Sequence, residues 1–537
     1  MLRQLVTKTH PFSTSVRFGS PLSKISRMSK TMESIIRDRT RLGNQPYVNC
    51  KTRIISLMDI EIPEKASDDE YRQLYKAYVA KAPTNSNAQL LLDAVDSIKY
   101  GICPPVAFPT ETVYGLGADA TNEPSVAGIF AAKGRPSDNP LIVHVSSVQH
   151  LERVTGSALP DIYKSLADKF FPGPLTILLP VPTPSHFARN VHPGQETIGF
   201  RIPSSKYARF FIAVCDRPIA GPSANSSGKP SPTTAQHVFD DLQGKINFIL
   251  DAGPCDVGVE STVVDGLHDP PLILRPGGVS QAELIAHGNR YDNRFAHTAI
   301  GYQRHDDQLN SMPTSPSVPS NVSTPCSSSS TLALAGKYDH HANGAPRAPG
   351  MKYRHYAPKG RMTLFSQRAV ENDRVQTKLD NLVEASPASN IRLGIISCHW
   401  PPFAGLHLPS PPSKSSHIDT DSDPVSQSAY SAITKTAHLN LPNKTNLTLY
   451  DVHLGPEISV LAQSLFGVLR LFDDLKCDYI FAETVRRSTP SEIESKTDLN
   501  SVDVPKLIDR DHVIKKRDLE DAVIDRIEKA AGERIDS

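Results

Sequence analysis

The stretch PVAFPTETVYGL, residues 105–116, places a short apolar run directly before a cluster of polar groups. Pro105–Phe108 is predicted to be a buried strand, and Pro109–Leu116 brings two hydroxyls, a carboxylate and a phenol to its end. Polar groups at the carboxyl edge of a strand are where α/β domains bind ligands. An ordinary strand-to-helix loop has a similar composition, so this stretch alone leaves both interpretations open.

The surrounding sequence predicts an α/β domain over about residues 53–286. Helices are expected at Ser86–Tyr100, with Ser86 as its N-cap and Gly101 as its end, and at Pro124–Lys133. Further short apolar runs predict strands at Leu141–Val145, Leu175–Leu179, Thr197–Ile202, Phe248–Leu250, Ser261–Val264 and Leu272–Leu274. Strands mixed with helices indicate a twisted mixed sheet with flanking helices.

The rest of the chain divides by composition. Residues 287–347 contain a run rich in Ser, Pro and Thr, which cannot bury a core and is expected to be disordered. Residues 348–360 then form a linker, and residues 361–537 alternate predicted strands and helices, which indicates a smaller Rossmann-like domain. These elements are Arg392–Ser397, Leu447–Tyr450, Gly455–Phe472, Tyr479–Ala482 and Asp518–Ala531. The domain has no G-x-G-x-x-G motif, so nothing indicates dinucleotide binding.

Composition narrows the functional classes. A chain of 537 residues is long enough for two domains, and its net charge of +1 argues against a broad nucleic-acid surface. Its 7 cysteines form no C-x-x-C pair, so we expect reduced thiols and no structural zinc or other protein-bound metal. No apolar run is long enough to cross a membrane.

Residues 1–32 are basic, rich in Ser and Thr, and without Asp or Glu. This composition is typical of a mitochondrial transit peptide, and equally of a disordered basic tail. Met28 and Met32 offer later starts, so we expect a cytoplasmic form and hypothesise a second, mitochondrial one.

The segment Lys133–Leu141, KGRPSDNPL, carries two cations separated by one glycine and followed by two prolines. Arg offers a planar fork and Lys a point charge, which together suit phosphates or carboxylates. A solvated helix terminus is the alternative, since basic residues there favour the helix dipole. His144 follows on a predicted strand, where a lone histidine is more often a core residue than a ligand contact.

The segment Gly221–Ser231, GPSANSSGKPS, is not a P-loop, because six residues separate its glycines and Pro230 follows the lysine. A small-residue turn rich in N–H and hydroxyl donors can still bind anions, although a flexible loop has the same composition. Arg201, within a predicted strand, needs a partner or a ligand. No catalytic triad or paired-carboxylate site is visible, so these groups favour non-covalent positioning of phosphates and a carboxylate.

Taken together, these segments resemble the two-domain threonylcarbamoyl-AMP synthases, which have the YrdC-like fold. The Lys133/Arg135 and Ser223/Asn225 pairs match the hallmarks of the family. The matched order is Pro109–Gly117, Lys133–Val145, Pro172–Thr176, Gly221–Lys229, Glu260–Val264 and Leu274–Gly277, followed by the linker Pro349–Pro358. The resemblance covers the first domain in order, and the long insertion before the linker departs from the compact family pattern.

The resemblance implies that L-threonine, bicarbonate and ATP, with Mg²⁺, give threonylcarbamoyl-adenylate and pyrophosphate. A separate complex then transfers the threonylcarbamoyl group to tRNAs that read ANN codons. The implied threonine contacts are Thr112, His144, Arg201 and Ser261. The implied nucleotide contacts are Arg135, Asn139, Thr197, Ser223, Asn225, Ser231 and Arg275. Lys133 and Arg135 would be catalytic, and Tyr353, His355 and Tyr356 would form a lid.

Two rival functions remain at this point. A hydrogenase-maturation carbamoyltransferase shares the catalytic fold, but the lack of any C-x-x-C pair counts against it. A non-catalytic RNA-binding module is disfavoured by the near-neutral charge and by the absence of interleaved aromatic and basic residues.

The leader prediction can be tested on protein purified from mitochondria. Edman sequencing should find a new N-terminus beyond the basic segment, because transit peptides are removed after import. An intact Met1 in that fraction would contradict cleavage.

Overall fold

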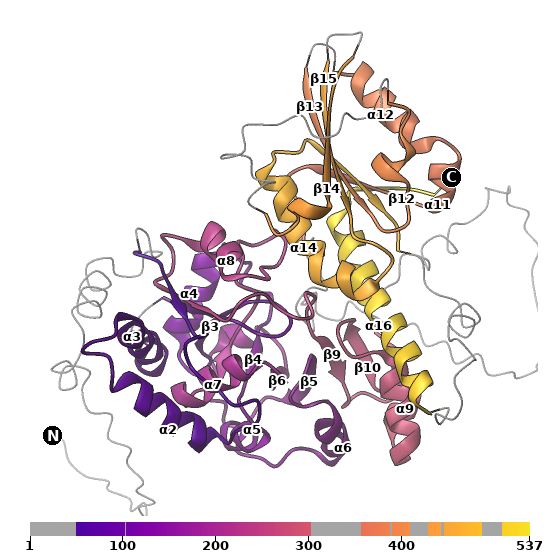
Figure 1. Ribbon diagram of the computed structural model, residues 1–537. Helices are drawn as coiled ribbons and strands as arrows, with labels where there is room; N and C mark the ends of the chain where they lie inside the picture. Colours follow the sequence, from indigo (N-terminus) through magenta and orange to yellow (C-terminus); the bar gives the residue numbers. More distant parts are fainter. Residues whose placement is uncertain are drawn as a thin grey trace, which may run out of the picture.

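A computed structural model describes residues 50–101, 104–301, 356–386, 389–408, 428–441, 445–485 and 507–536, with side chains in the last helix from Leu519 onward. The predicted leader, the Ser/Pro/Thr-rich run, Tyr353 and His355 lie outside these ranges. Figure 1 shows two α/β bodies in the described part of the chain, with two long helices between them. Within these residues, no helix combines the length and apolar character needed to span a membrane.

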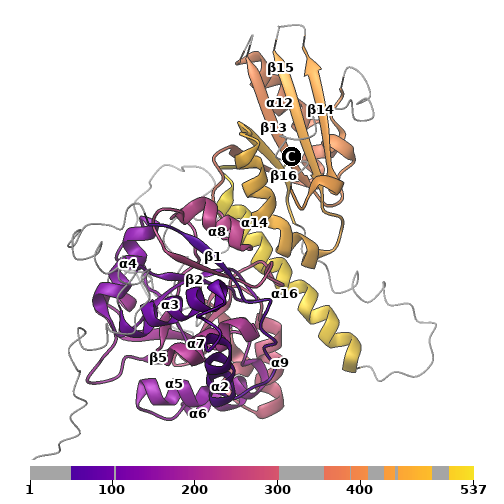
Figure 2. The same ribbon diagram turned by 60° about the vertical axis from the view of Figure 1, so that its left-hand side comes forward.

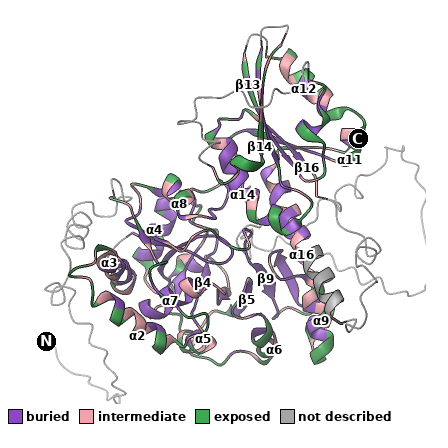
Figure 3. Cartoon of the chain, viewed as in Figure 1, coloured by how far each residue is buried: buried purple, intermediate pink, exposed green. Residues whose placement is uncertain are grey.

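The first body is built on an eleven-stranded mixed sheet with the order β1-β8-β2-β3-β7-β4-β6-β5-β9-β10-β11. Its strands are β1 Arg53–Ser56, β2 Val106–Phe108, β3 Gly115–Asp119, β4 Ile142–His144, β5 Leu175–Pro180, β6 Thr197–Arg201, β7 Ile219–Ala220, β8 Phe248–Asp251, β9 Thr262–Asp265, β10 Leu272–Arg275 and β11 Ala299–Ile300. Both parallel and antiparallel pairs occur, which confirms the predicted mixed sheet. Figure 3 shows the strands buried between helices whose outer faces are exposed.

Helices cover both faces of this sheet (Figure 2). They are α2 Asp68–Val79, α3 Ser86–Tyr100, α4 Glu123–Lys133, α5 Val148–Thr155, α6 Asp161–Phe170, α7 Lys206–Cys215, α8 Ala235–Leu242 and α9 Gln281–Tyr291, with short 3-10 turns η2 Arg189–Val191 and η3 Arg294–His297. Local sequence sets their ends: Asn122 caps α4 by accepting from the Ser125 N–H, and left-handed Gly134 ends it.

The second body has a six-stranded sheet with the order β14-β15-β13-β16-β12-β17, parallel except for the edge strand β14. Its strands are β12 Arg361–Phe365, β13 Asn390–Ser397, β14 Thr434–Asn440, β15 Asn446–His453, β16 Tyr479–Glu483 and β17 Glu533–Ile535. Its helices are α11 Gln367–Glu371, α12 Arg374–Glu384, α14 Ile458–Asp474 and α16 Leu507–Ala530, with 3-10 turns η4 Pro402–Gly405 and η5 Ser431–Ile433. This alternation matches the predicted Rossmann-like layer.

The helices α14 and α16 lie between the second sheet and the first domain in both Figure 1 and Figure 2. One apolar cluster joins Val113 and Val259 of the first domain to Tyr356 and to side chains of both helices. The two domains approach each other closely at Gly258, where an added Cβ would lie 2.4 Å from Gln463 Cα and 2.5 Å from Ala462 O. The two domains are therefore packed directly against each other.

The structure corrects several predicted boundaries. Folded chain continues beyond Ala286 to Gly301, because β11 pairs with β10 and extends the sheet. Asn85, rather than Ser86, caps α3, since the Asn85 side chain accepts from two N–H groups of the first turn. The last helix starts at Leu507 instead of Asp518. Strand β3 was not predicted: a Cβ at Gly115 would lie 2.8 Å from the Phe108 ring, so glycine stands where an apolar residue would have marked a strand.

We predict that Gly258→Ala will loosen the contact between the domains. Its φ of +78° already disfavours a side chain, and the new Cβ would also meet the α14 backbone. The matched control is Gly253→Ala, with φ +82° and no atom within 4 Å of the added Cβ. In calorimetry, the control should lower the midpoint temperature of the first unfolding transition by about 2–4 °C. Gly258→Ala should lower it by at least about twice as much, because its side chain also meets the α14 backbone. Equal shifts in the two variants would contradict the close contact.

Candidate active site

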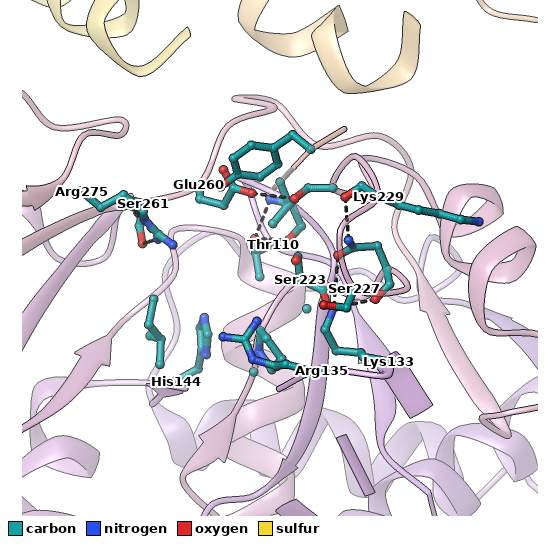
Figure 4. A pocket seen from close by; sticks show the side chains of 18 of the residues that line it. Thr110, Lys133, Arg135, His144, Ser223, Ser227, Lys229, Glu260, Ser261 and Arg275 are labelled. Atoms are coloured by element: carbon teal, nitrogen blue, oxygen red, sulfur yellow. Dashed lines mark hydrogen bonds between the residues drawn. The ribbon is translucent and has the colours of Figure 1, made fainter. Parts of the chain in front are cut away.

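A pocket opens where the ends of several strands of the first sheet meet. Most of the predicted site residues line it: Lys133, Arg135, His144, Arg201, Ser223, Asn225, Ser231, Ser261, Arg275 and Tyr356. They come from segments far apart in the sequence, including the ends of β4, β6 and β10 and the turn after β7. Figure 4 shows Ser261 and Arg275 on one side of the pocket and Lys133, Ser223 and Ser227 on the other. The fold thus brings together groups that the sequence only placed in order.

One side of the pocket is organised around Arg201, the last residue of β6. Its guanidinium pairs with Glu111 at 2.7 Å and donates to Thr112 Oγ1 at 2.8 Å. All three side chains are buried. Burial alone would raise the pKa of Glu111, but the Arg201 charge and hydrogen bond lower it below its ordinary value. Arg201 is therefore held in place by an ionised carboxylate, which provides the partner that a charged residue within a strand requires.

Ser261 connects two further segments on the same side. Its hydroxyl lies 2.8 Å from Thr176 Oγ1, and the Arg275 guanidinium donates both to the Ser261 hydroxyl at 3.1 Å and to the Ser261 carbonyl at 2.9 Å. These hydrogen bonds fix the end of β10 against the start of β9. The result is a fixed hydroxyl next to a cation, an arrangement suited to a carboxylate or phosphate.

Lys133 lies on the opposite side and anchors the small-residue turn. Its Nζ is 2.5 Å from Ser223 O, 2.6 Å from Asn225 O and 3.2 Å from Asn225 Oδ1. These acceptors match the three N–H groups of an ammonium, so Lys133 contacts a phosphate only by exchanging one of them. Burial, and then the nearby Arg135 charge, lower the pKa of Lys133 well below its usual value. In this structure Lys133 positions the Ser223–Asn225 turn.

Arg135 lies at the pocket wall, and its guanidinium donates to Pro140 O at 3.0 Å. Two of the predicted nucleotide contacts lie elsewhere. Thr197 starts β6, about 13 Å along the strand from Arg201, and lines a second, smaller pocket. Asn139 is buried in the loop after Arg135, outside the wall of the main pocket. The sequence alone did not show which end of strand β6, or which part of the loop after Arg135, borders the main pocket.

His144 ends β4 directly beside Arg201 in the sheet, as its register partner on β6. The imidazole is buried, and its Nδ1 has no hydrogen-bond partner in the described part of the chain. Burial, reinforced by the Arg201 charge, lowers the pKa of His144 to about 3. A neutral imidazole with an unused polar atom at the pocket wall is therefore suited to a hydrogen bond with a ligand.

Comparisons with known proteins point to one family. The Sua5/YciO/YrdC model, described as telomere recombination, matches residues 104–277, and the threonylcarbamoyl-AMP synthase C-terminal domain model matches residues 326–532. The Schizosaccharomyces pombe threonylcarbamoyl-AMP synthase is 40% identical over 334 residues, which are 58% of this chain and 71% of that protein. The Bacillus subtilis threonylcarbamoyl-AMP synthase is 34% identical over 379 residues, 71% of this chain and 84% of its own.

The chain belongs to the threonylcarbamoyl-AMP synthase family. A solved structure agrees: Pyrococcus abyssi Sua5 complexed with L-threonine aligns over 90% of this chain and 100% of its own, with a TM-score of 0.56 and 28% identity. The resemblance to this family, and the fold that it implies, are therefore confirmed. The roles assigned to single residues remain predictions; the structure places most of these residues at the main pocket, and Thr197 and Asn139 outside its wall.

Sequence reasoning assigned no role to several residues that shape this synthase-type pocket. Glu111 and Glu260 lie within segments that match the family, but the sequence does not show that they are buried beside arginines. Arg470 and Arg526 of the second domain were missed, although Arg470 lies within the apolar run of α14 and that position was a usable signal. Among the described residues, no group of His, Cys, Asp and Glu is arranged to hold a metal ion.

We predict that His144 stays neutral from pH 5 to 8. Burial and Arg201 hold its pKa at about 3, so lowering the pH to 5 does not charge it. NMR of protein with ¹³C-labelled histidine, with His144 assigned by His144→Gln, should show one resonance that does not shift over this range. A midpoint between pH 5 and 8 for that resonance would contradict the buried, neutral imidazole.

Proposed function

We propose that this chain synthesises L-threonylcarbamoyl-adenylate from L-threonine, bicarbonate and ATP, with release of pyrophosphate. The product serves the threonylcarbamoyladenosine modification of tRNAs that read ANN codons. Membership of the synthase family supports the reaction. The observation that carries it is the pocket itself, in which Arg201 and Ser261 lie across from the turn anchored by Lys133, with Arg201 held from behind by buried Thr112.

The chemical difficulty of this reaction is the approach of two anions. The threonine amine bonds to the bicarbonate carbon and water leaves, which gives a carbamate. A carbamate oxygen then bonds to the α-phosphorus of ATP while the bond to the β-phosphate oxygen breaks, and pyrophosphate leaves. Cations that surround the reacting groups reduce this repulsion, and fixed cations do so without reorganising during the step.

The charges of the pocket suit both halves of the reaction. On the Arg201 side, a cation, two hydroxyl groups and a neutral imidazole match the carboxylate, hydroxyl and amine of threonine. On the other side, the Ser223–Asn225 turn and Arg135 offer N–H and guanidinium donors to the phosphates. Nothing in this set is arranged for covalent catalysis, so the contribution of the protein is to position and stabilise charge.

Further expectations belong to the same proposal. Mg²⁺ accompanies ATP as part of the substrate, with the phosphates as its principal ligands. The adenylate passes to a separate transferase complex that acts on tRNA. We place the enzyme in the cytoplasm, with a second mitochondrial pool if the basic leader directs import.

We predict that Lys133→Ala and Arg135→Ala each lower threonine-dependent pyrophosphate release about a hundredfold or more. Removal of Lys133 leaves the carbonyl oxygens of Ser223 and Asn225 without their donor, and removal of Arg135 takes a cation from the pocket. The assay combines ATP, L-threonine and ¹⁴C-bicarbonate and measures pyrophosphate and labelled adenylate together. Lys164→Ala is the control, because its exposed ammonium pairs with neighbouring Asp161 on α6 and does not line the pocket.

Wild-type turnover in Lys133→Ala or Arg135→Ala would contradict the role proposed for that residue. RNA binding by a wild-type protein that makes no adenylate would instead favour the non-catalytic module. Circular dichroism and melting of each variant would establish that the loss of turnover does not come from unfolding.

A further inference from the structure

A buried ion pair joins the second domain to the wall of the pocket. Arg526, on α16, is completely buried, and its Nε lies 3.0 Å from Glu260 Oε2. Glu260 stands just before β9 in the first domain and lines the pocket. Arg526 also pairs with the neighbouring Asp525 at 3.0 Å, so its buried charge is compensated by carboxylates of both domains.

Glu260 also connects Arg526 to a second residue of the pocket wall. Its other oxygen, Oε1, accepts a hydrogen bond of 2.6 Å from the Ser231 hydroxyl. The Arg526 guanidinium also donates to Pro276 O at 2.8 Å, directly after Arg275. One side chain of the second domain thus fixes both ends of the wall that carries Ser231 and Arg275.

A second arginine acts on the opposite rim. Arg470 of α14 pairs with buried Asp241 at 3.0 Å and also donates to Pro230 O. Asp241 in turn accepts from the Ser226 N–H at 3.1 Å and from Lys229 Nζ at 2.8 Å. The small-residue turn is therefore held from the second domain as well as by Lys133.

The electrostatics show what Arg526 contributes beyond packing. Burial would raise the pKa of Glu260, but Arg526 first, and then Arg275 and Ser231, lower it to about 2. Without Arg526, the buried carboxylate would either take up a proton or draw Arg275 toward itself as its remaining cation. Either change alters the acceptor that orients Ser231 and the direction of a cation in the pocket.

We propose that Arg526 is a positioning residue of the active site: it satisfies Glu260, so that Ser231 and Arg275 face the nucleotide. The second domain then supports from behind a pocket whose lining comes from the first domain and from Tyr356 of the linker. The proposal rests on the assignment of an ATP site to this pocket. It gives the second domain a stated contribution to the reaction.

The decisive experiment is a double-mutant cycle read out as ATP binding. Arg526→Met should weaken ATP binding, measured by calorimetry without threonine or bicarbonate, about tenfold or more. Adding Glu260→Gln should restore the affinity to within about threefold of the Glu260→Gln variant alone, because the unpaired charge is gone. In steady-state kinetics, the loss should appear mainly in KM for ATP rather than in kcat.

Lys378→Met is the matched control. It removes another ion pair of the second domain, between Lys378 and Glu533 at 2.7 Å, whose partners both lie outside the pocket. This variant should keep the ATP affinity and KM of the wild type. A loss in Lys378→Met equal to that in Arg526→Met would overturn the proposal, since any weakened ion pair would then have the same effect.

Other outcomes are equally informative. Unchanged ATP binding in Arg526→Met, or the same loss with and without Glu260→Gln, overturns the proposal. If Arg526→Met does not fold, Arg526→Lys replaces it: one ammonium lacks the fork that serves Glu260 and Pro276 together, so binding should weaken about threefold or more. Unchanged affinity in folded Arg526→Lys then overturns it. Wild-type protein that binds ATP but makes no adenylate would refute the proposed function alone.

Discussion

Buried carboxylates paired with arginines are the constraint on which this active site depends. Such pairs in the described part of the chain include Glu111 with Arg201, Asp241 with Arg470, and Glu260 with Arg526. A buried carboxylate needs a cation or hydrogen-bond donors to replace its lost hydration, so each of these carboxylates fixes the place of its arginine. Because these carboxylates stand in the segments around the pocket, the same pairing that allows their burial also determines where the pocket presents its cations and hydroxyls.

Two of these pairs link the two domains beside the pocket. The first pair lies within the catalytic domain, whereas the other two cross to α14 and α16, the helices between the sheets (Figure 1). Apolar packing around Val113, Val259 and Tyr356 joins the domains, and the two arginine pairs cross the same contact. Tyr356, stacked on Phe466 at 5.0 Å, joins the end of the linker to the same layer. The pocket lining and the packing of the domains therefore share Val113 and Tyr356.

Much of the fold could be predicted, because local patterns mark most of its elements. The helix at Ser86–Tyr100 follows from its apolar periodicity and its glycine end, and Glu123–Lys133 is bounded by Asn122 and Gly134. Prediction failed where tertiary contact replaces local preference. Strand β3 was missed because its glycines make room for the Phe108 ring, and β11 because its pairing with β10 is too short to leave a pattern. The start of α16 was placed too late because its first turns carry a mostly polar sequence.

The sequence by itself determined the family, the two-domain α/β architecture and the hallmark pairs Lys133/Arg135 and Ser223/Asn225, because these are properties of residue order. Only the tertiary structure decided what each charge does. In the structure, Lys133 holds the Ser223–Asn225 turn, and Thr197 lies away from the main pocket. Glu260 pairs with Arg526, which is 266 residues away in the sequence. The physical reason is that the state of a buried charge depends on its neighbours in space, and those neighbours come from distant parts of the chain.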